Sequence, residues 1–171
     1  MKHFTRGWHS GELTDEESRR VANAYQHRLA EITPKLPPAL RELASISLHD
    51  AVIDHIIWTP HAKRLEIEFA ALAGDQTYRT VGLRYEGALL GDQRIEALRN
   101  AARDRETEVL ATEVDVDENG LFSHRLLFWP RDEVTIDFVE LHLTVTPRDG
   151  PRVGPKPAFY QALPDDDPEP E

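Results

Sequence analysis

The segment from residue 106 to residue 145 constrains the fold of this chain more than any other. Within it, three runs rich in β-branched and aromatic residues are separated by two clusters of turn formers, Asp-Glu-Asn-Gly at 117–120 and Pro-Arg-Asp-Glu at 130–133. Runs of this kind, bounded by short turns, are typical of strands that pair in antiparallel order. The segment therefore predicts an antiparallel meander, whose last strand changes its apolar face near Phe138.

Three further strands are predicted upstream, over residues 47–58, 62–71 and 77–90. In the second of these, Leu65 and Ile67 alternate with Glu66 and Glu68, so one face is buried and the other is in contact with water. The first carries apolar residues on both faces, either because a bulge shifts its phase or because both faces are covered.

Helical periodicity precedes the strands. Thr14 and Glu17 have the spacing of a capping box, which predicts a helix that starts at Thr14 and ends near Thr33 because Pro34 follows. A short second helix follows Pro37, and residues 92–103 fit a third helix capped by its first residue, an aspartate. Two aromatic residues of the polar opening segment are expected to anchor it to the domain; they are Phe4 and Trp8.

These patterns predict an α+β fold, with an amino-terminal helix packed on a mainly antiparallel sheet of about six strands. We expect one domain over residues 1–147, because prolines and acidic residues dominate residues 148–171. That tail is expected to be extended or disordered. Its candidates for docking on the domain are Val153, Phe159, Tyr160 and Leu163.

The chain has a formal net charge of -11 and no cysteine. An acidic chain repels phosphate, which argues against a nucleic-acid partner and favours a basic protein partner. The lack of cysteine excludes disulfides and thiolate chemistry. Because neither a signal peptide nor a membrane span is evident, we expect a cytoplasmic location and no membrane association.

The sequence contains only weak evidence for a metal site. A site with two histidines and a carboxylate could use His49, Asp50 and His55 together with His124 or His142. The spacing matches no known ligand motif, so solvated or capping roles are favoured and no cofactor is predicted. Residues 115–120 copy the start of a calcium loop, but its twelfth position is Leu126, and Asn-Gly favours a hairpin turn instead.

No Gly-x-Ser-x-Gly elbow or phosphate-binding glycine pattern is present, so the sequence gives no basis for a catalytic residue. The best candidate for binding is the polar face of the predicted hairpin over residues 62–90, with two tryptophans at strand ends as aromatic anchors. The alternative is that this face only confers solubility. The candidate residues are Glu66, Glu68, Arg84, Glu86, Trp58 and Trp129.

Several short phrases resemble an uncharacterised family of bacterial domains. They are the opening Met1-Lys2-His3-Phe4-Thr5 with Trp8, then Leu48-His49-Asp50-Ala51, Thr112-Glu113-Val114-Asp115 and His124-Arg125-Leu126-Leu127-Phe128. The family's usual tyrosine at the third position and aromatic residue after Trp8 are His3 and His9 here. A Leu-His-Asp phrase before a small antiparallel sheet is also similar to immunity proteins of polymorphic toxins, which implies binding to a toxin without catalysis.

The sequence thus favours a non-enzymatic protein-binding module, similar to an immunity protein or antitoxin, that neutralises a basic bacterial toxin. The alternative is a small metal-dependent hydrolase built on the histidine and aspartate set. The identity of the partner, the oligomeric state and the role of the tail do not follow from the sequence.

Overall fold

A computed structural model describes residues 1–104, 106–150 and 158–162 of the chain. Its helical elements are α1 (Arg6–His9), α2 (Asp15–Ile32), the 3-10 turn η1 (Thr33–Lys35), α3 (Pro38–Ser45) and α4 (Asp92–Arg103). Its strands are β1 (Val52–Thr59), β2 (Arg64–Leu72), β3 (Tyr78–Glu86), β4 (Glu108–Val116), β5 (Phe122–Trp129), β6 (Glu133–Phe138), β7 (Glu140–Arg148) and β8 (Ala158–Gln161). The predicted α+β class and mainly antiparallel sheet are confirmed.

The strands form one sheet in the order β6-β5-β4-β1-β2-β3-β7, and β8 pairs in parallel with β1. The described residues therefore form eight strands, more than the six predicted. One extra strand arises because the predicted last strand divides at Val139 into β6 and β7, which lie at opposite ends of the sheet order. The other is β8, which lies within the predicted tail.

The sheet coils around its apolar side chains. β1 and β4 share a single register pair, Val52 with Glu108, and β8 pairs with the following part of β1. The hydroxyl of Tyr85 on β3 lies 2.8 Å from Nδ1 of His124 on β5, although these two strands are not neighbours in the sheet. Both side chains are buried, so the two ends of the sheet face each other across one core.

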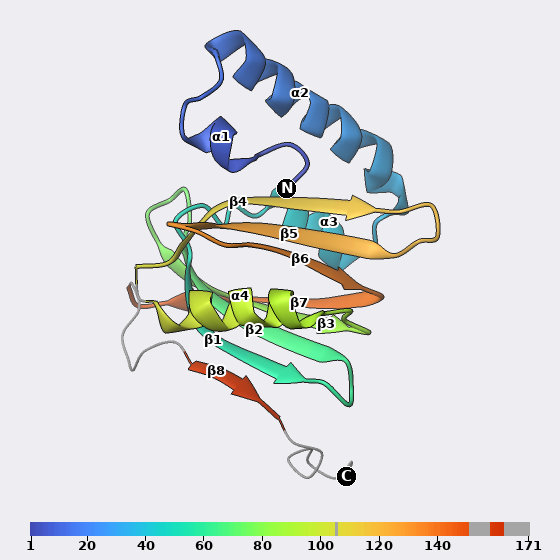
Figure 1. Ribbon diagram of the computed structural model, residues 1–171, viewed down its shortest axis with the longest axis vertical. Coiled ribbons are helices and arrows are strands. Elements are labelled where there is room, and N and C mark those ends of the chain that lie inside the picture. Colours follow the sequence, from blue (N-terminus) through green and yellow to red (C-terminus); the bar gives the residue numbers. More distant parts are fainter. Residues whose placement is uncertain (105, 151–157, 163–171) are drawn as a thin grey trace.

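Helices cover the sheet in different places (Figure 1). α3 inserts Leu40 and Leu43 into the core, and α4 adds Leu98. α1 and α2 lie at one end of the molecule, beside β4 and β5, whereas β8 lies at the opposite end (Figure 1). Each large apolar side chain that is fully buried contributes roughly 1.5–3 kcal/mol to folding, so this core is the main source of stability.

Local signals placed the ends of α2 and α4 closely, whereas the first strand begins at Val52 rather than residue 47 and the third ends at Glu86 rather than residue 90. The capping box of Thr14 and Glu17 is present, and α2 ends one residue before Thr33. A bulge between Ile53 and His55 confirms one of the two explanations for the uneven first strand. The expected aspartate cap of α4 is wrong, because Gly91 is the N-cap and makes no side-chain hydrogen bond.

Part of the predicted tail is structured. The Phe159 ring packs against the core and lies 5.0 Å from the Arg99 guanidinium carbon, whereas Tyr160 is half exposed. The predicted docking of Val153 and Leu163 lies outside the described residues. None of the helices in the described ranges is both long enough and apolar enough to span a membrane.

Candidate functional site

The outward-facing side chains of β1, β2, β3 and β7 form a surface that we call the open face. It comprises His55, Glu66, Glu68, Gly82, Arg84, Glu86, Glu140, His142 and Thr144. The alternation of β2 places Leu65 and Ile67 in the core and both glutamates on the opposite side. α3 and α4 bury their apolar side chains in the core, so among the described elements no helix covers this face.

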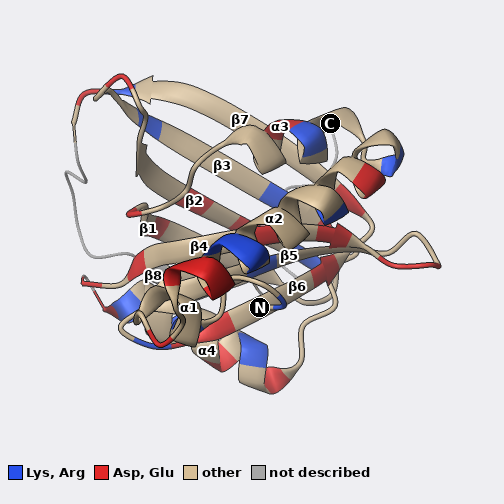
Figure 2. Cartoon of the chain, turned by 90° about the horizontal axis from the view of Figure 1, so that it is seen from above, with Lys and Arg blue, Asp and Glu red and all other residues tan. Residues whose placement is uncertain are grey.

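The open face brings together the four charged residues that the sequence singled out. Glu66 lies opposite Arg84 in the register of β2 and β3, and acidic segments of β2 lie beside basic segments of β3 in Figure 2. The Arg84 Nε atom is 3.3 Å from Glu86 Oε1, so this arginine is engaged within its own strand. Glu66 makes no ion pair with the residues that the structure describes.

Acidic groups outnumber the permanent cations on this surface. Arg64 lies at its border with Nε 3.6 Å from Glu86, while Glu140 faces Glu86 from β7. The two histidines approach glutamates, at 3.4 Å for His55 and Glu68 and at 3.5 Å for His142 and Glu140. Four carboxylates against two arginines leave a local excess of negative charge.

A depression of about 500 Å³ lies on the open face around Gly82. A Cβ atom at Gly82 would lie 2.5 Å from the Thr144 hydroxyl oxygen and 3.9 Å from Glu68 Cγ. The Thr144 hydroxyl therefore packs directly against Gly82, where any side chain would clash with it. Glu66 and Glu68 both line the depression, which could accept a basic side chain.

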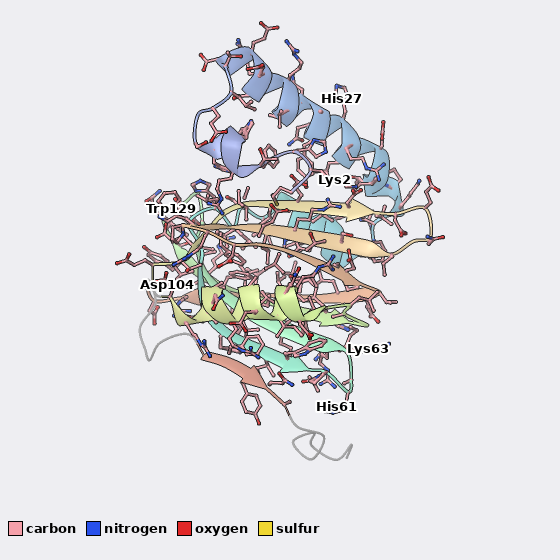
Figure 3. The ribbon with its side chains drawn as sticks, in the orientation of Figure 1. Lys2, His27, His61, Lys63, Asp104 and Trp129 are labelled. Carbon is pink, nitrogen blue, oxygen red and sulfur yellow. The ribbon has the colours of Figure 1, made fainter. Side chains whose placement is uncertain are left out.

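The two predicted aromatic anchors differ in their exposure to solvent. Trp58 is only 5% exposed and belongs to the core, so its assignment as a contact residue is wrong. The bulge in β1 turns it inward, opposite the buried Leu65. Trp129 is 54% exposed at the end of β5, where Figure 3 shows it at the margin of the molecule, but β5 is not part of the open face.

Sequence reasoning missed an apolar corner at the border of the open face. Val139 is 64% exposed and Leu89 is 46% exposed. They flank the point where β6 leads into β7, since the Leu89 N–H donates to Asp137 O and the Val139 N–H donates to Glu86 O. Glu86 and Glu140 flank the same corner, so an apolar contact and negative charge lie together.

The alternative metal site is not assembled. His49 is exposed and its Nδ1 lies 2.9 Å from Asp50 Oδ1, His55 lies on the open face, and His124 is buried in the core. The bulge and the coiled sheet separate residues that a flat sheet would place together. Across residues 1–104, 106–150 and 158–162, no group of three or more histidine or acidic residues is placed to hold a metal ion.

The calcium-like phrase is a hairpin turn, as favoured from the sequence. The Asp117 Oδ1 atom accepts the N–H groups of Asn119 and Leu121, both at 2.8 Å, and Gly120 has φ 81°. Asp115 points elsewhere, to Lys2 and Arg28. The oxygens of this phrase therefore stabilise the turn.

A second charged surface lies on the outer side of β4 and β5, and it is covered. We call it the covered face; it comprises Glu113, Asp115 and Arg125 with the residues over them. Three successive backbone N–H groups, of Lys2, His3 and Phe4, donate to the Glu113 carboxylate at 2.7–2.9 Å. Burial opposes ionisation of Glu113, but these bonds and Arg125 outweigh it and lower its pKa.

Asp115 lies at the centre of a network of cations. Lys2 Nζ donates to Oδ2 at 2.8 Å, and Lys2 lies between α2 and β4 in Figure 3. Arg28 donates to Oδ1 at 2.7 Å and to the Val116 carbonyl at 2.9 Å. Burial would raise the pKa of Asp115, but the bonds from Lys2 and Arg28 hold it far below its usual value.

Aromatic side chains complete the covered face. The Phe4 ring lies 5.0 Å from both Trp8 and Tyr25, which confirms the predicted anchoring of the opening segment. The Tyr25 hydroxyl accepts the Val114 N–H at 2.9 Å. Tyr25 and Arg28 thus satisfy backbone groups of β4 where no strand pairs with it, so α2 closes this edge of the sheet.

The Tyr85–His124 pair makes a polar contact inside the core. Burial, with a smaller effect from Arg125, lowers the pKa of His124 to about 3, and burial raises the pKa of Tyr85. His124 Nε2 is buried without a hydrogen-bond partner among the described residues. The imidazole is therefore neutral at pH 7 and serves packing.

No family model, curated protein or solved structure matches this chain.

Proposed function

We propose that this chain is a non-enzymatic protein-binding module whose open face holds a basic protein. The observation that carries the proposal is the depression at Gly82, lined by Glu66 and Glu68 on an uncovered sheet face. A lysine or arginine of the partner would enter it and meet two carboxylates. The similarity to immunity proteins favours a basic bacterial toxin as the partner.

The surrounding surface supports the same role. The strands that carry the open face are packed on the core, so its side chains are held on a rigid element. Val139 and Leu89 provide an apolar contact at its border, which would add buried area to the charge attraction. The structure offers no comparable support for the metal-dependent hydrolase, so we do not propose it.

The test uses the product of the reading frame adjacent to the gene. We expect the two proteins to copurify at equal stoichiometry and to bind more weakly as salt concentration rises. The Glu66→Lys/Glu68→Lys variant should weaken binding at least about 100-fold by calorimetry, since two attractive contacts become repulsive.

A matched control changes the same amount of charge elsewhere. Glu31→Lys/Glu118→Lys alters two exposed glutamates, on α2 and at the β4–β5 turn. It should leave the affinity within about threefold, because long-range effects are screened at physiological salt. Equal losses in both variants would show only a net-charge effect and would contradict recognition by the open face.

A further inference from the structure

β7 ends the order of paired strands, so one of its two edges has no partner strand among the described residues. Such an edge presents a row of N–H and C=O groups that can bind another strand. We propose that this edge of β7 pairs in antiparallel order with the same edge of a second copy of the chain. The result would be a twofold-symmetric dimer with one continuous sheet.

β7 suits this role better than the other free edges. It has nine residues, whereas β6 has six and β8 has four. β6 and β8 pack against α4, and β7 packs against α3. A depression of about 520 Å³ lies beside Val145–Arg148. The half of β7 that ends at Arg148 therefore has room beside it for side chains of a neighbouring strand.

The sequence of β7 is complementary to itself when it is reversed about Thr144. In that register Leu143 meets Val145 of the second copy, and Thr144 meets its own equivalent. Leu143 and Val145 are only half-buried, which is the state expected of core-facing residues that lack a neighbour on one side. Apolar pairs and threonine pairs are favourable across antiparallel strands.

The ends of the strand carry opposite charges. Reversal about Thr144 places Glu140 opposite Arg148 of the second copy, and the twofold axis makes this contact twice. Glu140 is 64% exposed, and Arg148 is held in place by an ion pair with Asp54. A single arginine in the wrong register would meet no carboxylate, so these contacts also specify the register.

The net charge of -11 on each chain does not prevent two copies from pairing through this edge. β7 itself carries one glutamate and one arginine and is balanced. Repulsion between the two acidic bodies is screened beyond roughly 8 Å at physiological salt. The dimer would also place two open faces side by side on one sheet, which would double the surface available to a bivalent partner.

Light scattering of the full chain in 150 mM salt, over a range of concentrations, tests the proposal. We expect the mass to rise to twice 19.5 kDa at tens of micromolar. Glu140→Arg should weaken dimerisation at least about tenfold, because each dimer then holds two arginine pairs. Within one chain this change is safe for folding, since Glu140 lies opposite Glu86.

The decisive experiment mixes two variants that each carry one substitution at an end of β7. Arg148→Glu alone should also be monomeric, but an equimolar mixture with Glu140→Arg should dimerise, because both contacts then join opposite charges. Unfolding curves check that Arg148→Glu, which loses the Asp54 ion pair, remains folded; if it does not, Glu140→Arg alone decides. A monomeric mass for the natural chain, or a dimer that Glu140→Arg leaves intact, would overturn the proposal.

The control separates this inference from the proposed function. Glu66→Lys/Glu68→Lys lies on β2, away from the β7 edge. It should leave the dimer unchanged while it impairs partner binding. Loss of the dimer in this variant would contradict pairing through β7.

Discussion

The same sequence pattern has opposite outcomes in two strands. Leu65-Glu66-Ile67-Glu68 in β2 and Thr112-Glu113-Val114-Asp115 in β4 both place two carboxylates on the outer side of the sheet. On β2 the carboxylates belong to the open face. On β4 they are buried, with Glu113 at 0% and Asp115 at 6% exposure.

The difference comes from what lies over each strand. The opening segment and α2 cover β4, and they bring backbone N–H groups, a lysine and an arginine to the carboxylates. A buried carboxylate is tolerated only with such partners. Alternation therefore predicts which way a side chain points, whereas donors distant in the sequence decide whether it is structural or available for binding.

The largest expected effect is at the covered face. Glu113→Gln removes a charge that three backbone N–H groups and Arg125 share, so the free energy of unfolding should fall by about 3–5 kcal/mol. The matched Glu66→Gln on the open face should change it by less than about 0.5 kcal/mol. Urea unfolding of both variants measures the difference, and similar losses would remove the distinction between the faces.

The second effect depends on pH. His124 has a pKa of about 3 in the folded chain, below its ordinary value, so the unfolded chain binds a proton that the folded chain does not. The free energy of unfolding should therefore decrease as pH falls from about 6.5 towards 3, by at most about 1.4 kcal/mol per pH unit. Urea unfolding at several values between pH 6 and pH 5 measures this slope.

The control for this slope removes the buried pair together. In His124→Leu/Tyr85→Phe neither polar group is left without its partner, and the slope should be shallower than in the natural chain. Other groups, including His9 whose pKa burial lowers, remain in both proteins. An equal slope in the Leu/Phe variant would show that His124 is not the source.

A smaller effect tests how the covered face is closed. Tyr25→Phe keeps the ring against Phe4 but leaves the Val114 N–H without its acceptor. We expect a loss of about 1–3 kcal/mol in unfolding free energy. Hydrogen exchange at Val114 should also accelerate, and unchanged protection there would mean that α2 does not cap the edge of β4.

The smallest effect concerns the start of the covering helix. Thr14→Ala removes the hydroxyl that accepts the Glu17 N–H, and should cost about 1 kcal/mol. A thermal scan in which this variant melts at the same temperature as the natural chain would contradict a stabilising role of the capping box.

Much of the fold followed from the sequence because its signals are local. The capping box at Thr14, the alternation in β2 and the Asn-Gly turn each involve neighbouring residues. The division at Val139 was visible only as a change of face. Its consequence, that β6 and β7 lie at opposite ends of the sheet, depends on how the whole sheet coils.

The site was less predictable for the same reason. The four charged residues of the open face were found because they follow the alternation of one hairpin. Trp58 was misplaced because a bulge reverses the phase of β1. Nothing near Glu113 in the sequence reveals that Lys2, His3 and Phe4 cover it, since that contact spans more than a hundred residues.

Carboxyl labelling of the folded chain, read by mass spectrometry, tests the contrast between the faces most directly. A water-soluble carbodiimide with an amine should modify Glu66 and Glu68 rapidly, and Glu113 and Asp115 only after unfolding. Addition of the basic partner should then protect Glu66 and Glu68. Comparable labelling of all four carboxylates in the folded chain, or labelling of Glu113 before Glu66, would contradict the account.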